Sequence, residues 1–97
     1  MITNSEFLIF HYNRAKQAFQ KCILDEENAF LQDEIEIGLD EIILVEEFLR
    51  IQFNKNQLEK FTVEVKFQLT SSSQVSIGEY YYCLNEDDIE EDRLIFI

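Results

Sequence analysis

Residues 61–69 alternate strictly between apolar and polar side chains, and this pattern constrains the fold more than any other feature of the chain. The apolar positions are Phe61, Val63, Val65, Phe67 and Leu69. Successive side chains of a strand point to opposite faces, so the segment is predicted to form a strand with one buried face. One such strand cannot bury its apolar face alone, and it needs further strands and a covering layer.

Two further strands are predicted after residue 69. A polar turn over residues 70–74 precedes a second strand over residues 75–84, within which Gly78 predicts a bulge. An acidic loop over residues 85–92 then leads to a short closing strand over residues 93–97. Consecutive strands joined by such short loops favour an antiparallel meander.

The N-terminal segment has helical periodicity. Thr3 and Glu6 have the spacing of a capping box, in which Thr3 is the N-cap. Apolar residues then recur at intervals of three or four, and they predict a helix from Asn4 to Leu24.

Residues 31–53 carry an apolar stripe that also predicts helix. Its positions are Leu31, Ile35, Gly38, Ile42, Val45, Leu49 and Phe53. One helix of about 25 residues and two helices that meet near Gly38 satisfy this pattern equally. The chain is therefore expected to be a single α+β domain over residues 1–97, in which an N-terminal helical hairpin of two or three helices packs on a three-stranded antiparallel β-meander.

Twenty acidic and eight basic residues give the chain a formal net charge of −12. Residues 25–49 contain ten acids and no base, and residues 68–97 contain seven acids and one base. A direct nucleic-acid binder needs a basic surface, and so does a protein that docks on anionic membranes. The charge argues against both classes and is compatible with a basic protein partner or with mimicry of nucleic acid.

The residue types that carry enzymatic and metal chemistry are sparse. His11 is the only histidine and lies on the apolar stripe of the first helix, where a structural role is expected. Cys22 and Cys83 form no C-x-x-C pair, and neither glycine belongs to a phosphate-binding loop. The acidic run over residues 85–92 lacks the central glycine of a calcium-binding loop. We therefore expect no enzymatic activity, no cofactor and no metal.

The residues at the start of the sequence are not expected to act as a targeting signal. The first ten residues have no basic segment of the kind that begins a signal peptide. The chain has no apolar run as long as the roughly 18 residues of a membrane-spanning helix. Two cysteines without a dense framework favour free thiols in a reducing compartment. The expected location is the cytoplasm.

Two surface patches are predicted to bind the partner. Acidic pairs recur about every seven residues, and on a continuous helix they would form one outward acidic face. The residues of this first patch are Asp33, Glu36, Asp40 and Glu47. The second patch combines three consecutive tyrosines with the acids that follow, namely Tyr80, Tyr81, Tyr82, Glu86, Asp87 and Asp88. Two other interpretations stay open: the acids are a solvated face, and Tyr80 and Tyr82 cover the second face of the sheet.

The end of the chain resembles one class of small acidic proteins. The segment from Gly78 to Leu84 contains a glycine and three tyrosines, Glu86-Asp87-Asp88 forms an acidic turn, and residues 93–97 form a short strand. Such hairpins are similar to those of the immunity proteins of bacterial toxin–immunity systems, among them contact-dependent inhibition and Maf-type systems. The resemblance implies tight binding to a cognate toxin, often a nuclease, and occlusion of its basic active-site cleft.

Two alternatives are kept. A phage- or plasmid-encoded nucleic-acid mimic would place its carboxylates where DNA phosphates lie and would inhibit a DNA-handling defence enzyme. A small homo-oligomeric scaffold would use the helical stripe for self-association. A homodimer is also compatible with an immunity protein.

Overall fold

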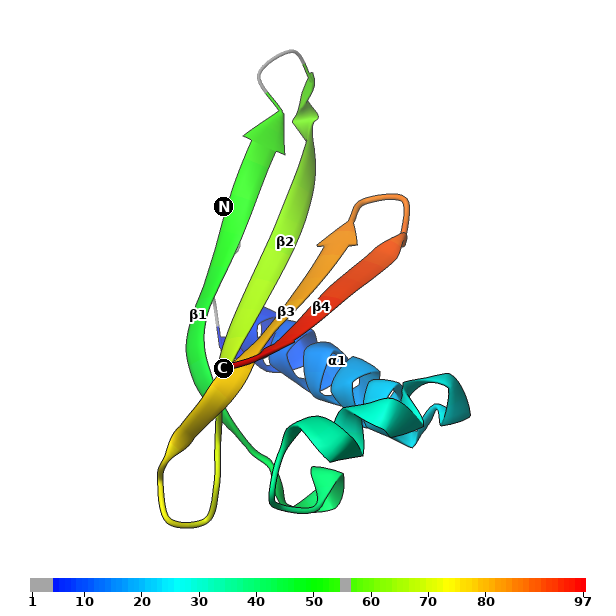
Figure 1. The fold of residues 1–97 in the computed structure, drawn as a ribbon. Coiled ribbons are helices and arrows are strands. Elements are labelled where there is room, and N and C mark those ends of the chain that lie inside the picture. Colours follow the sequence, from blue (N-terminus) through cyan, green and yellow to red (C-terminus); the bar gives the residue numbers. More distant parts are fainter. Residues whose placement is uncertain (1–4, 55–56) are drawn as a thin grey trace.

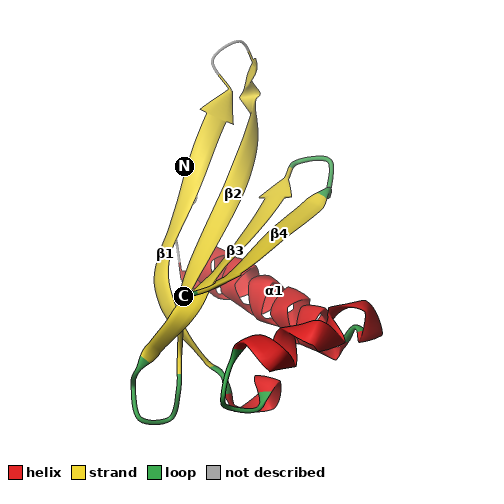
Figure 2. Cartoon of the chain, viewed as in Figure 1, coloured by secondary structure: helices red, strands yellow, loops and turns green. Residues whose placement is uncertain are grey.

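A long helix lies across one face of a four-stranded antiparallel sheet (Figures 1 and 2). This computed structural model describes residues 5–54 and 57–97. In chain order the elements are α1 (Ser5–Leu24), the 3₁₀ helices η1 (Glu26–Glu34) and η2 (Leu39–Glu41), and the strands β1 (Ile43–Asn54), β2 (Gln57–Thr70), β3 (Ser76–Asn85) and β4 (Glu90–Phe96). The strands lie in the order β1-β2-β3-β4, each antiparallel to its neighbours. The fold is therefore α+β, as predicted.

The apolar core lies between α1 and the sheet. Its buried residues are Ala15 and Phe19 of α1, Val63, Val65, Phe67 and Leu69 of β2, and Tyr80, Tyr82 and Leu84 of β3. The predicted strand over residues 61–69 is thus confirmed within β2. The ring of Phe19 lies 5.1 Å from the ring of Tyr80. Full burial of one large apolar side chain contributes about 1.5–3 kcal/mol, so this layer holds α1 on the sheet.

The first helix agrees with its prediction at the C-terminal end, since α1 ends at Leu24. The predicted N-cap Thr3 and the predicted first residue Asn4 lie outside the described residues. His11 is 7% exposed, and its ring lies 4.4 Å from the ring of Phe7 and 5.0 Å from the ring of Phe10. Burial lowers the pKa of His11, and the nearby positive charge of Arg14 lowers it further.

The predicted helix or helices over residues 31–53 are wrong. Residues 26–41 form the two short 3₁₀ helices, and β1 follows from Ile43 to Asn54. The helical hairpin is therefore absent from the described residues, and the sheet has four strands instead of three. Gln32 contributes to this outcome, because its side-chain amide donates to the carbonyl of Ile37 at 2.6 Å and accepts from the N–H of Leu39 at 2.9 Å. Side-chain bonds to the backbone compete with a continuous helix.

A β-bulge explains why β1 has helical spacing in the sequence. The pairing of β1 with β2 shifts register between Glu46 and Phe48. Before the bulge Ile42 and Leu44 pack against the core, and after it Leu49 and Ile51 do so. The extra residue changes the phase of a period-two pattern, so the inward positions follow intervals of two, five and two. Ile42 and Leu49 lie seven residues apart, the spacing of two helical turns, so both also fit the apolar stripe that predicted helix, whereas Val45 of that stripe is exposed.

Two tight turns set the positions of β3 and β4. The turn from Ser71 to Val75 places Gln74 at φ 64°, and the turn from Asn85 to Ile89 places Asp88 at φ 60°. Both connections follow the three-residue hairpin pattern, whose last residue is left-handed. The predicted acidic loop is shorter than expected, because β4 already begins at Glu90.

Gly78 permits the close approach of β3 and β4. A Cβ at this position would collide with the backbone carbonyl oxygen of Ile95. The predicted bulge lies next to Gly78. Leu69 and Thr70 of β2 pair with Gly78 and Ser76 of β3, so Ile77 is the residue without a partner in this pairing. Within the described ranges, no helix is both long enough and apolar enough to cross a bilayer.

Candidate functional site

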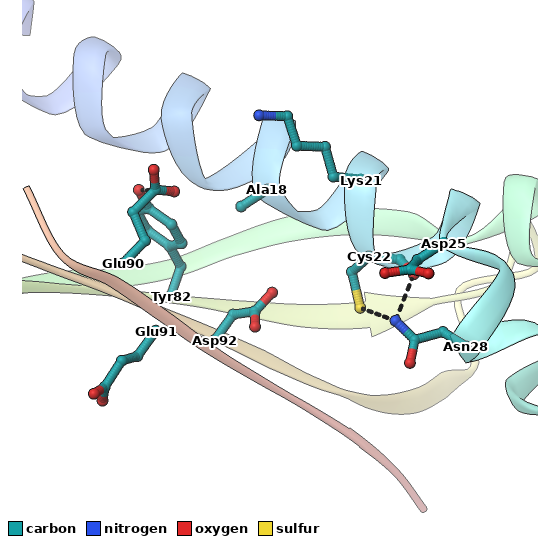
Figure 3. A pocket seen from close by; sticks show the side chains of 9 residues that line it. All are labelled: Ala18, Lys21, Cys22, Asp25, Asn28, Tyr82, Glu90, Glu91 and Asp92. Atoms are coloured by element: carbon teal, nitrogen blue, oxygen red, sulfur yellow. Dashed lines mark hydrogen bonds between the residues drawn. The ribbon is translucent and has the colours of Figure 1, made fainter.

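An acidic groove runs between α1, the start of η1 and the edge strand β4. Its volume is about 290 Å³, and the side chains that line it are drawn in Figure 3. The residues that line it are Ala18, Lys21, Cys22, Asp25, Asn28, Tyr82, Glu90, Glu91 and Asp92. Four of these side chains are carboxylates and one is an ammonium, so the groove is net negative. We call this set of residues the acidic groove.

Two buried tyrosines hold the carboxylates of β4 in place. The hydroxyl of Tyr82 donates to Glu90 at 2.8 Å, and the hydroxyl of Tyr80 donates to Asp92 at 2.8 Å. Arg14 of α1 adds a second bond to Glu90 at 3.2 Å. The bond from Tyr82, followed by that from Arg14, lowers the pKa of Glu90. Burial, followed by the bond to Glu90, raises the pKa of Tyr82 to about 12. Glu90 is thus a fixed, ionised acceptor at neutral pH.

The opposite wall of the groove is built at the junction of α1 and η1. The side-chain amide of Asn28 donates to the carbonyl of Cys22 at 3.0 Å and to its sulfur at 3.8 Å (Figure 3). The carboxylate of Asp25 accepts from the backbone N–H of Glu27 at 3.0 Å and begins η1. Burial, with Asp92 and Asp25 nearby, raises the pKa of Cys22. Its thiol is therefore a poor nucleophile.

A second cavity of about 380 Å³ continues the groove towards the N-terminal half of α1. It shares Ala18, Lys21 and Glu90 with the acidic groove. Phe10 and Arg14 also line it, so this part is amphipathic instead of acidic. The two cavities are therefore neighbours along α1, and Glu90 of β4 lines both.

The three predicted tyrosines do not form one surface. Tyr80 is 0% exposed and Tyr82 is 1% exposed, and both lie beneath α1. They therefore cover one face of the sheet, which was the other interpretation of their pattern. Tyr81 points to the opposite face, where its hydroxyl donates to Glu79 at 2.9 Å. A partner could reach Tyr81 but not its two neighbours.

The three predicted acids of the hairpin stay together in the turn between β3 and β4. Asp87 and Asp88 are exposed, and Asp88 lies 4.0 Å from Arg14. The carboxylate of Glu86 accepts from the backbone N–H of Phe61 at 2.6 Å. This turn leads directly into β4 and so into the acidic groove.

The four predicted acids of the middle segment do not share a helix face. Asp33 lies in η1, Glu36 in the following loop and Asp40 in η2, and all three are exposed. Glu47 lies at the bulge of β1 and bonds Lys66 at 2.7 Å. Their alignment depended on a continuous helix, which this segment does not form.

The face of the sheet that α1 leaves uncovered carries a network of ion pairs and cation–π contacts around Lys66. Lys66 lies near its centre, 5.9 Å from the ring of Phe48 and 5.6 Å from the ring of Tyr81. Its ammonium also contacts Glu47 and Glu79, and the bond to Glu47 contributes most to raising its pKa. A base is thus paired with two acids at the centre of this face, whereas four carboxylates and one ammonium line the acidic groove.

Several residues of the groove were missing from the predicted site. Asp25 was not singled out in the sequence, and Glu90 to Asp92 were expected only as part of the acidic loop over residues 85–92. Both belong to acidic segments that are visible in the sequence, but only the tertiary structure brings Asp25 next to residues 90–92. Among residues 5–54 and 57–97, no three His, Cys, Asp or Glu side chains are grouped so as to hold a metal ion. The groove offers carboxylate hydrogen-bond acceptors and a net negative charge.

Comparisons of this chain with protein-family models, with curated proteins and with solved structures find no match.

Proposed function

We propose that this chain is an inhibitory binding protein of the toxin–immunity kind, which binds a basic toxin, most simply a nuclease, and blocks its active-site cleft. One observation carries the proposal. Asp25, at the start of the acidic segment over residues 25–41, lines the same groove as three acids of β4 that are far away in the sequence, Glu90, Glu91 and Asp92. A strongly negative surface beside a free strand edge is suited to a basic protein partner.

The lack of compensating bases supports this proposal. Residues 25–41 contain eight acids and no base, and none of these acids forms an ion pair with a base in the described part of the chain. Unpaired surface carboxylates repel one another and weaken the fold slightly. The same charges would accelerate encounter with a basic partner.

The nucleic-acid mimic has less support. A mimic needs carboxylates at regular intervals along an axis, as phosphates are placed along a duplex. The sequence pattern offered such intervals only on a continuous helix through residues 31–53. That segment contains the end of η1, a loop, η2 and nearly all of β1. The acids of this segment therefore do not lie at regular intervals along one axis.

Capture of the partner tests the proposal. The purified chain is used as bait in a lysate of the source organism, with stepped salt washes and identification by mass spectrometry. We expect a basic toxin whose activity falls to zero as the chain is added up to one equivalent. A bound basic enzyme that keeps its full activity would refute inhibition. A DNA-handling defence enzyme released by competing DNA would favour the mimic.

A further inference from the structure

We propose that the partner binds by strand addition at β4: an extended segment of the basic protein pairs with the free edge of this strand and becomes a fifth strand of the sheet. This inference rests on the proposed function for the existence of a basic partner. It adds the mode of binding and the side-chain pattern that the partner segment must have. β4 is one of the two outer strands of the sheet, and no described strand lies beyond it (Figure 1).

The hydrogen-bond pattern identifies the backbone groups that β4 leaves free. The N–H of Ile97 donates to the carbonyl of Ile77 at 3.0 Å, and the N–H of Asn85 donates to that of Ile89 at 3.2 Å. Directly opposed residues of an antiparallel pair alternate between bonded and non-bonded pairs. Odd-numbered residues of β4 therefore bond β3. The backbone N–H and C=O groups at the outer edge belong to Glu90, Asp92, Leu94 and Phe96.

The other outer strand is less suited to addition. β1 is bent by the bulge between Glu46 and Phe48, and bulges of this kind protect strand edges. Glu46 is also paired with Lys16 of α1 at 3.0 Å. β4 pairs with β3 without any register shift, from Phe96 opposite Gly78 to Glu90 opposite Leu84. A regular edge of seven residues can accept an extended segment along its whole length.

The side chains of β4 specify the chemistry of the segment that pairs with it. Glu90 and Asp92 lie on the same side of the sheet as α1 and line the acidic groove. Each accepts one tyrosine bond, and a carboxylate has further acceptor sites. Leu94 and Phe96, farther along the same side, pack against the apolar core. The segment should therefore carry basic side chains opposite Glu90 and Asp92 and apolar ones opposite Leu94 and Phe96.

A second copy of this chain is a poorer occupant of the edge. Each copy carries a formal net charge of −12, and strand addition would bring two acidic grooves close together. A basic segment instead neutralises the carboxylates that it meets. Charge complementarity thus selects the basic partner.

A designed peptide tests strand addition without the natural partner. The probe is Val-Thr-Val-Glu-Lys-Thr-Lys, written so that an antiparallel alignment places its lysines opposite Asp92 and Glu90 and its glutamate opposite Arg93. In this alignment the N–H groups of its third and fifth residues point to β4, and those of its second and sixth residues point away. One variant is N-methylated at its third and fifth residues, and the other variant is N-methylated at its second and sixth residues. They have equal charge, and each lacks two N–H donors.

Strand addition predicts different affinities for the two methylated peptides. Methylation of the third and fifth residues should weaken binding at least about tenfold, because inward hydrogen bonds are lost and a methyl group meets the edge. Methylation of the second and sixth residues should change the affinity less than about twofold. In the complex, amide hydrogen exchange should slow at Asp92 and Leu94, which have no intramolecular ladder partner.

Three results would overturn strand addition. Equal affinities of the two methylated peptides would show binding by side-chain charge alone, and the proposed inhibitory function would survive that result. A lack of binding by the parent peptide up to about 1 mM would remove β4 as a docking edge. Protection of the Asp92 and Leu94 amides in a dimer of the free chain would assign the edge to a second copy.

Discussion

The hydroxyl of Tyr80 donates a hydrogen bond of 2.8 Å to the carboxylate of Asp92, and this bond links the buried layer under α1 to the acidic edge of the sheet. Tyr80 is 0% exposed, whereas Asp92 is exposed on β4. Burial, followed by the bond to Asp92, raises the pKa of Tyr80. The core thus fixes the position of a charge that faces the acidic groove.

Replacement of Tyr80 by Phe should weaken this link. The substitution Tyr80→Phe keeps the ring and its packing but removes the donor to Asp92, so the free energy of unfolding should fall by about 1–2 kcal/mol. Urea denaturation followed by circular dichroism measures the change. Tyr81→Phe is the matched control, because its bond to Glu79 lies on the open face and should matter less. An equal loss in both variants would contradict the account.

Gly78 should tolerate no side chain. The substitution Gly78→Ala places a methyl group against the backbone of β4 and should lower the free energy of unfolding by about 1–3 kcal/mol. At Gly38 the atom that a Cβ would meet first is a side-chain oxygen of Asp40, which can rotate away. Gly38→Ala should therefore lower the free energy of unfolding much less than Gly78→Ala does. Thermal unfolding of the two variants distinguishes them, and equal midpoints would show that β3 and β4 are not in close contact.

Gln74 occupies a left-handed backbone conformation that glycine adopts more readily. The substitution Gln74→Gly should raise the free energy of unfolding by up to about 1 kcal/mol, because the φ of 64° strains a residue with a Cβ. Ser72→Gly in the same turn is the control. Ser72 does not have a positive φ, so glycine there should destabilise the fold through the entropy of the unfolded chain. A decrease in stability for Gln74→Gly would refute the turn assignment.

His11 should make the fold less stable in mild acid. Burial holds its folded pKa below 6.5, so the unfolded chain binds more protons as the pH falls through this value. The free energy of unfolding should therefore decrease as the pH falls from neutral towards the folded pKa. Glu79 and Glu90 have lowered pKa values, so their stabilisation is lost only below 4.5. His11→Gln should reduce the change in the free energy of unfolding between pH 7 and the folded pKa of His11. If the free energy of unfolding of this variant falls as steeply with pH as that of the wild type, His11 is not the cause.

The sequence predicted the elements whose hydrophobic period is unbroken. Residues 61–69 alternate without interruption, and the structure places them in β2 as expected. The end of α1 at Leu24 was also predicted correctly. β1 was misassigned because its bulge near Glu47 interrupts the alternation, and its strand conformation depends on pairing with β2, a long-range contact that local spacing does not encode.

The candidate site was predicted only in part. Sequence indicated an acidic surface near Asp87 and Asp88, and these residues do lie at the entrance to the acidic β4 edge. It could not show that Tyr80 and Tyr82 face α1, because three consecutive tyrosines can be placed on a strand in either phase. The contribution of Asp25 depends on how η1 folds back beside β4, which requires the tertiary structure.

The most direct test of the account compares two charge-reversed variants for binding to the captured partner. Asp87→Lys with Glu91→Lys alters the β4 side, and Asp33→Lys with Asp40→Lys alters η1 and η2. Each pair raises the formal net charge by four, from −12 to −8, so the long-range attraction is equally reduced. Isothermal titration calorimetry should show at least about a tenfold larger loss of affinity for the β4 pair than for the other pair. Equal losses, or a larger loss for the η1–η2 pair, would contradict the assignment of partner binding to the acidic edge of the sheet.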